Sequence, residues 1–325
     1  MPDIFKDNPL APPSPLEEAR FISHSVAQEN VFECQRELSR DERRCIELGI
    51  YQGRENCLRI GNSSVAAIIA PETGLRILHF GPLDGPNFFK ENPFEGGIPG
   101  HPDYRLQGGQ RLCVAPEGEM TYALDNDPLE SWKINSSGDL VLTQKRDSAG
   151  FEKQMTLSAS QGSGFLYITN EITNQSGTAQ EIATWSVSMM APGGIAVARA
   201  ENFKALQNIN PNDPRIARDD RRIFVRQLQD EENLPGIKIG CRCSGLLYAI
   251  GNHFVSKVAL EFDPTAQYAD QNTSCQIFTM GNIQDGVTEL ELTSPLRVVQ
   301  PGETIALKEC LIWKHSEKSA RFPRP

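Results

Sequence analysis

The stretch KQMTLSASQGSGFLYITNEITNQSG, residues 153–177, indicates the fold class of the chain. It holds two β-rich runs, at 153–160 and 165–173, and a turn sequence follows each of them, QGSG and then NQSG. Hydrophobic residues recur in these runs with a period near two rather than 3.6, and the turns consist of glycine and polar residues. This pattern is typical of successive antiparallel strands.

The same pattern of β-rich runs separated by turns extends on both sides of this stretch, from Tyr51 to Trp313. More than a dozen short β-rich runs recur between turn residues, with almost no helical signal among them. Such a series predicts an all-β fold with large antiparallel sheets rather than a parallel α/β sheet. No repeat of fixed period occurs, which disfavours a propeller or a solenoid. We therefore expect one β-sandwich domain over residues 49–315.

The ends of the chain have a different character. Residues 1 to about 20 are rich in proline and acidic residues and predict an irregular tail. Residues 27–48 carry many charges, and apolar residues recur there at a spacing that predicts one or two surface helices. We expect residues 1–48 to form a short helical N-terminal extension and residues 316–325 to form a C-terminal tail.

The composition restricts the partners. The 325 residues carry a formal net charge of −10, so phosphate backbones and anionic lipids repel the chain. No window approaches the roughly 20 apolar residues that a membrane span needs, and the first residues do not resemble a signal peptide. We expect a cytoplasmic protein that binds a small molecule and neither nucleic acid nor membrane.

Several common chemistries lack their motifs. The sequence contains no G-x-S-x-G elbow, no phosphate-binding G-x-x-x-x-G-K-[ST] loop and no dinucleotide-binding G-x-G-x-x-G. Its five histidines are not paired at metal-ligand spacing. We therefore expect no cofactor and no metal site.

Five segments together carry a resemblance to a known family. Their order along the chain resembles that of the galactose mutarotase-like superfamily, in a branch apart from the true aldose 1-epimerases. The resemblance covers about residues 49–315 and implies a β-supersandwich that acts on sugars or binds them. The segments are PETGLRILHFGPLDGPNFF (71–89), GGQRLCVAPE (108–117), TWSVSMMAPGG (184–194), YAIGNHFVSKVALEFDPTAQYAD (248–270) and TELELTSPLRVVQPGET (288–304).

The second segment contains candidate binding residues. A Gly-Gly turn lets a ligand approach the backbone closely, and Gln110 and Arg111 offer hydrogen-bonding groups that suit hydroxyls. In the true epimerases the resemblance places a histidine-containing pair here, whereas this chain has Gln110. We expect Gln110 and Arg111 to line a concave face together. The alternative is a surface ion pair between Arg111 and Glu117.

The candidate catalytic residues come from the last segments. The resemblance places the general-base glutamate in TELELTSPL, where Glu289 and Glu291 share one face of a strand; we favour Glu291, with Glu289 as a like-charged neighbour that raises its pKa. The alternative is that both carboxylates are exposed on a convex face. Where the epimerases carry a catalytic histidine, this chain offers Trp185, which either stacks on a sugar ring or packs in the core.

Further polar residues complete the candidate cleft. Lys238 and Lys257 each lie in a largely apolar strand, and either could serve in acid-base chemistry if burial lowered its pKa. Arg76, Asp263 and Tyr268 are candidates for the rim of the cleft.

Three functions fit these residues. The first is a mutarotase or related epimerase with a glutamate base in a concave cleft. The second is another isomerase or lyase on the same scaffold, since a fold does not determine its chemistry. The third is a non-catalytic carbohydrate-binding protein.

Overall fold

Antiparallel strands dominate the computed structural model, which describes residues 32–40, 44–83, 85–91, 105, 107–125, 127–160, 164–201, 203–210, 212–228, 235–283 and 286–317. These residues form 23 strands, one 3-10 turn (Pro71–Thr73) and one four-residue helical turn, α2 (Ala269–Asn272). The predicted all-β fold is therefore confirmed. No helix in the described ranges is long and apolar enough to span a membrane.

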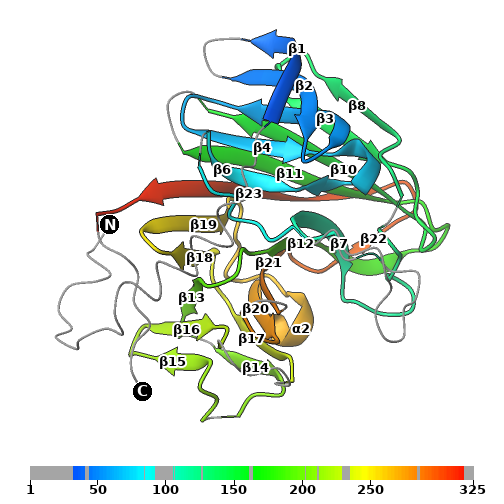
Figure 1. Ribbon diagram of the computed structural model, residues 1–325. Helices are drawn as coiled ribbons and strands as arrows, with labels where there is room; N and C mark the ends of the chain where they lie inside the picture. The colour runs from blue at the N-terminus through cyan, green and yellow to red at the C-terminus, as the bar shows by residue number, and fades with distance from the viewer. Residues whose placement is uncertain are drawn as a thin grey trace.

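The strands form three sheets (Figure 1). The five-stranded sheet has the order β1 (Phe32–Arg40), β2 (Cys45–Tyr51), β3 (Arg54–Gly61), β4 (Val65–Ile69) and β6 (His79–Pro82). The ten-stranded sheet has the order β15 (Ile216–Arg218), β16 (Arg222–Arg226), β13 (Ile195–Arg199), β18 (Gly245–Ile250), β19 (His253–Ala259), β23 (Thr304–His315), β11 (Phe165–Asn174), β10 (Phe151–Ala159), β9 (Leu140–Gln144) and β8 (Ser131–Ile134).

The eight-stranded sheet carries the candidate site. Its order is β14 (Lys204–Gln207), β17 (Ile237–Cys241), β20 (Cys275–Met280), β21 (Val287–Thr293), β12 (Gln180–Met189), β7 (Gln110–Ala115) and β5 (Arg76–Ile77), and β22 (Arg297–Val299) also pairs with β12.

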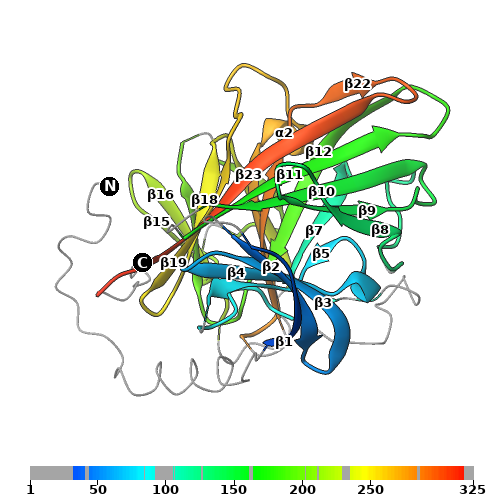
Figure 2. The same cartoon turned by 90° about the horizontal axis from the view of Figure 1, so that it is seen from above.

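The ten-stranded sheet is the layer that both other sheets cover. The five-stranded sheet contacts it through β3 with β10 and β4 with β11, whereas the eight-stranded sheet contacts it through β20 with β13 and β16, β21 with β19, and β12 with β11 and β23. Figure 2 shows β23 running the length of the molecule beside β11 and β19. One continuous core joins the layers, with buried residues from all three sheets.

The stretch 153–177 contains the clearest alternation of buried and less buried residues. β10 buries every second residue over its whole length, and it pairs with β11 residue by residue from Phe151 opposite Asn174 to Ala159 opposite Leu166. Of the turn expected between the two strands, residues 161–163 lie outside the described residues.

The expected helices at residues 27–48 are wrong for the part that the structure describes. Residues 32–40 and 45–51 are the strands β1 and β2, which extend the five-stranded sheet. β1 is exposed along five consecutive residues, so both of its faces meet solvent and it has no alternation of apolar and polar residues. The expected tail at 1–20, residues 27–31 and 41–43, and residues 318–325 lie outside the described residues.

A charged network is buried between the eight-stranded and ten-stranded sheets. Lys257 Nζ lies 3.2 Å from Glu309 Oε2 and donates to the hydroxyls of Ser186 and Ser188. Glu309 Oε1 also accepts hydrogen bonds from three side chains, namely Gln110, Asn170 and Ser186. Burial lowers the pKa of Lys257, although the ion pair with Glu309 opposes this shift. The two charges thus depend on each other within the core.

We expect Lys257→Met to lower the free energy of unfolding by about 3–5 kcal/mol, because it leaves the buried Glu309 carboxylate without its cation. Urea unfolding followed by tryptophan fluorescence measures the change. The matched control is Lys308→Met on β23, whose exposed ion pair with Glu261 should contribute less than about 1 kcal/mol. Equal effects of the two substitutions would contradict a charge pair in the core.

Candidate functional site

Strand β21 separates core residues from charged residues. Leu290 and Leu292 are fully buried in the core, so Glu289 and Glu291 lie on the opposite face of the sheet. Residues directly opposite each other on paired strands share a face. Glu291 pairs with Val187, Val187 with Arg111, and Arg111 with Arg76, and on the other side Glu289 pairs with Phe278 and Phe278 with Lys238. We call this surface the charged face, defined by Arg76, Arg111, Lys238, Glu289 and Glu291.

Glu291 is held through one of its two carboxylate oxygens. Its Oε2 accepts a hydrogen bond from Trp185 Nε1 at 2.9 Å and lies 2.8 Å from Lys238 Nζ. Its Oε1 is buried, and no hydrogen-bond donor among the described residues reaches it. The carboxylate is therefore fixed in orientation, while one oxygen keeps its capacity to accept a proton or a hydrogen bond.

Lys238 and Trp185 both serve to hold Glu291. The ammonium of Lys238 lies 5.0 Å from the centre of the Trp185 ring, so it covers the indole as well as pairing with the carboxylate. Burial alone would lower the pKa of Lys238, but the charge and hydrogen bond of Glu291 outweigh it, and the pKa is raised. The lysine is thus a cation near neutral pH. Trp185 thus contacts Lys238 through its ring and Glu291 through its Nε1, and the stacking of the ring on a sugar stays a prediction.

The pKa of the Glu289 carboxyl group is raised. Burial raises its pKa and the negative charge of Glu291 adds to this effect, whereas Arg111 and Lys238 act in the opposite direction. Arg111 NH2 lies 4.0 Å from Glu289 Oε1, at ion-pair distance. The face therefore presents two carboxyl groups in different environments, which is the usual way in which acid and base roles are separated.

Asp125 joins the two arginines of the charged face. Its Oδ2 lies 2.6 Å from Arg76 NH2 and 3.6 Å from Arg111 NH1, and Arg76 NH1 also donates to the Gly108 carbonyl. Burial would raise the pKa of Asp125, but the positive charges of Arg76, Arg111 and Lys153 outweigh it and lower the pKa. Arg76 is only 2% exposed, so this pair fixes the guanidinium at the edge of the face.

Two of the predicted site residues lie on the other side of the sheet. Gln110 precedes Arg111 in β7, so its side chain points into the core, where it is fully buried and donates to Glu309. The expectation that Gln110 and Arg111 line one face is therefore wrong. Lys257 also lies in that core network, away from the charged face.

Arg111 and Glu117 occupy different environments. The Arg111 side chain lies on the charged face and is 20% exposed, while Glu117 is exposed in the bend that follows Pro116. The ion-pair contacts of Arg111 described above are those with Asp125 and Glu289, and the alternative ion pair with Glu117 stays a prediction. The charge of Glu117 still acts on Glu289, whose pKa it helps to raise.

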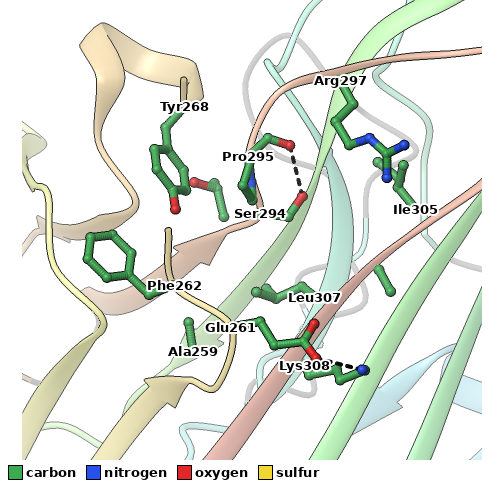
Figure 3. Close-up of a pocket in the computed structure, with 12 residues that line it drawn as sticks. Ala259, Glu261, Phe262, Tyr268, Ser294, Pro295, Arg297, Ile305, Leu307 and Lys308 are labelled. Carbon is green, nitrogen blue, oxygen red and sulfur yellow. Dashed lines mark hydrogen bonds and ion pairs between the residues drawn. The ribbon is translucent and has the colours of Figure 1, made fainter. Parts of the chain in front are cut away.

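Asp263 and Tyr268 lie beside a pocket at the end of β21 rather than among the charged residues. The Tyr268 hydroxyl donates to the Asp263 carbonyl at 2.9 Å, and its ring stacks on Phe262. Figure 3 shows Tyr268 and Phe262 on one side of this pocket of about 210 Å³, with Leu307 and the Glu261–Lys308 ion pair along the other. Asp263 is exposed and accepts from Thr265.

The described histidines lie elsewhere in the fold. His79 is buried beside Tyr51 in the five-stranded sheet, and burial lowers its pKa to about 4. His253 contacts Trp313 and His315 at the end of β19. His24 and His101 lie outside the described residues.

Only one group of described residues has ligand atoms close enough together to bind a metal ion. It consists of Glu37, Cys45 and Glu47 on β1 and β2. Its carboxylates already pair with Arg40 and Arg59, so we assign no metal to it.

Two residues next to the charged face, Asp125 and Gln276, were not identified from the sequence. Asp125 lies in an irregular segment, and nothing in the pattern relates it to Arg76. For Gln276 the strand periodicity was a usable signal. This residue precedes Ile277 in β20, so the two side chains lie on opposite faces, and β20 pairs with β21. Its cross-strand partner is Glu291.

Several solved structures have a similar fold. The chain is similar to a TPR-domain containing protein from Parabacteroides distasonis (TM-score 0.57, 14% identity), with 86% of this chain and 50% of that one covered, so it spans half of that protein. It is also similar to a galactose mutarotase-like protein from Lactobacillus casei (TM-score 0.53, 12% identity, 79% and 100% covered). A third is a candidate aldose 1-epimerase from Klebsiella pneumoniae (TM-score 0.53, 12% identity, 85% of each chain covered).

Neither a family model nor a curated protein matches the sequence. The structural matches establish the galactose mutarotase-like fold, as the sequence resemblance implied. At these identities the likeness concerns the fold.

We expect Asp125→Asn to lower the free energy of unfolding by about 3 kcal/mol at neutral pH, because it leaves the buried Arg76 guanidinium without its carboxylate. The pKa of Asp125 is lowered in the folded state, so the wild-type advantage is present above the unfolded-state pKa of about 3.9 and is lost as the pH falls through the folded-state value. Urea unfolding between pH 7 and pH 2.5 measures both effects. The control is Asp127→Asn, an exposed neighbour; an equal loss there would contradict the role given to Asp125.

Proposed function

We propose that this mutarotase-like protein is a carbohydrate-active enzyme that opens and recloses the hemiacetal ring of an aldose, with Glu291 as the general base. The observation that carries the proposal is the state of Glu291: one oxygen is held by Trp185 and Lys238, and the other is buried without a donor among the described side chains. A base in this position has a fixed direction and one available lone pair.

Glu289 supplies the acid that the missing histidine would otherwise provide. Its raised pKa favours the protonated form, and it lies two residues from Glu291 on the same strand face, about 6.6 Å along the chain. A protonated carboxyl can donate to the ring oxygen while an ionised one accepts from the anomeric hydroxyl.

The proposed step conserves protons. Glu291 accepts the proton of the anomeric hydroxyl, the bond between the anomeric carbon and the ring oxygen breaks as the carbonyl forms, and Glu289 donates its proton to that ring oxygen. After rotation of the carbonyl group the same steps run in reverse, and each carboxyl recovers its starting state. Trp185 and Lys238 act as positioning residues, since both act through Glu291.

The charge balance of the face favours a neutral ligand. Arg76 and Arg111 pair with Asp125, and Lys238 pairs with Glu291, so the positive charges of the face already have carboxylate partners. An additional anion on the ligand would lie beside carboxylates. A neutral aldose, with hydroxyl groups that donate and accept, suits these groups better.

Other chemistry has less support. A lysine base would need a lowered pKa, but that of Lys238 is raised, and Lys257 is buried in the core network. The names of structural neighbours, a mutarotase-like protein and a candidate aldose 1-epimerase, agree with a sugar substrate through the shared fold. A purely carbohydrate-binding protein would use the same face without accelerating exchange.

We expect Glu291→Gln to reduce the rate of anomeric exchange by about 10² or more, since the amide keeps the shape and removes the base. Polarimetry of freshly dissolved α-D-glucose and α-D-galactose measures the rate, with Glu261→Gln on the exposed ion pair as the control. Wild-type protein that does not exceed the buffer rate for any aldose would exclude the mutarotase proposal and leave the binding function.

The pH dependence should report Glu289. Because the acid must be protonated, the rate should fall as the pH rises through the raised pKa of Glu289. Glu289→Gln should lower the rate and remove this alkaline limb, which exchange NMR between pH 5 and pH 9 can follow. An alkaline limb that persists unchanged in the variant would assign the acid to another group.

A further inference from the structure

Gln276 lies next to Glu291, the proposed base. It is the direct cross-strand partner of Glu291 between β20 and β21, so the two side chains share a face with their Cβ atoms about 4.5–5.5 Å apart. Both residues are 1% exposed. A buried amide beside a buried carboxylate needs partners for all of its polar atoms.

The orientation of the Gln276 amide follows from its neighbours. Its Nε2 donates to Asp270 Oδ2 at 2.8 Å and to Thr273 Oγ1 at 3.1 Å. An ionised carboxylate only accepts hydrogen bonds, so the nitrogen must face Asp270 and the oxygen must point the other way. That oxygen, Oε1, is buried and has no donor within the described ranges.

Two buried acceptor oxygens therefore stand on adjacent positions of the sheet, Gln276 Oε1 and Glu291 Oε1. Leaving a buried acceptor without a donor costs about 1–3 kcal/mol, and here the cost arises twice at one place. A ligand with two neighbouring hydroxyl groups would supply both missing donors.

The residue that orients Gln276 sits in a strained turn. Asp270 has φ 48° and ψ 67°, Gln271 has φ 60° and ψ 33°, and Asn272 has φ 65°, so three consecutive residues other than glycine are left-handed. The turn is held by hydrogen bonds from the Tyr268 backbone to Asn272 and from Thr273 to the Asp270 carbonyl. Strain of this kind persists where the surroundings require the geometry, and it often accompanies functional sites.

We propose that Gln276 is a specificity-determining residue that accepts a hydrogen bond from the hydroxyl adjacent to the carbon on which Glu291 acts, and that Asp270 fixes its amide for this purpose. This inference rests on the proposed function, in which Glu291 receives the anomeric hydroxyl. The adjacent group in an aldose is the 2-hydroxyl, so the protein should distinguish aldoses from their 2-deoxy analogues.

Calorimetric titration with D-glucose, D-galactose and their 2-deoxy analogues tests the proposal. Wild-type protein should bind the 2-hydroxy sugars about tenfold more tightly or better, since a site built for a hydroxyl rejects a ligand that lacks it. Gln276→Met keeps the length of the side chain and removes the acceptor, so it should bind both members of each pair about equally. Gln227→Met, a buried glutamine that bonds Asn282 elsewhere, is the matched control and should keep the wild-type ratio.

A second variant guards against misfolding of the first. Asp270→Asn is an exposed change that tolerates a left-handed backbone but no longer dictates which way the Gln276 amide points, so the preference should fall several-fold with the fold intact. A wild-type preference below twofold, a ratio that survives Gln276→Met, or no binding of any of the four sugars would overturn the inference.

The same samples are followed by exchange NMR, which separates this inference from the proposed function. Discrimination by the wild type that is lost in Gln276→Met, without exchange above the buffer rate, would uphold the role of Gln276 in recognition and reject the enzyme. Exchange above the buffer rate with equal binding of 2-hydroxy and 2-deoxy sugars would reject the role of Gln276 and keep the enzyme.

Discussion

The alternation of side chains along β21 is the constraint on which the site depends. Leu290 and Leu292 lie in the core between the sheets, and this burial fixes the register of the strand. A slip of one residue would bring Glu289 and Glu291 into the core and move both leucines to the charged face, at a large cost in free energy. The same packing that stabilises the fold therefore holds the two carboxyl groups on one face, opposite Gln276 and Phe278.

The architecture was predictable where one face of a strand is buried and the other is not. β10 buries alternate residues throughout, and such strands define the all-β class from the sequence alone. The prediction for β1 was wrong for the opposite reason. This strand is exposed on both faces, so its sequence shows no period of two, and its many charged residues led to the prediction of a surface helix. Its strand conformation comes from pairing with β2, a tertiary contact that a local pattern does not contain.

The site was predictable to the extent that it follows strand periodicity. Glu289 and Glu291 share a face because they are two residues apart, and the same rule already excluded Gln110 and Arg111 from sharing one. Lys238 and Lys257 look alike in sequence, yet one pairs with Glu291 and the other with Glu309, because sheet pairing over long sequence distances determines their partners. Asp125 reaches Arg76 from an irregular segment, which no periodicity describes.

The left-handed turn at residues 270–272 has a consequence for how this protein can change. Glycine relieves the strain of a positive φ, so this turn is a place where thermostability could be gained by substitution. At Gln271 the exposed side chain makes such a change compatible with the neighbouring contacts, whereas at Asp270 it would remove the carboxylate that orients Gln276. These two adjacent residues thus differ. At Asp270 a gain in rigidity would reduce ligand selectivity, whereas at Gln271 it would not.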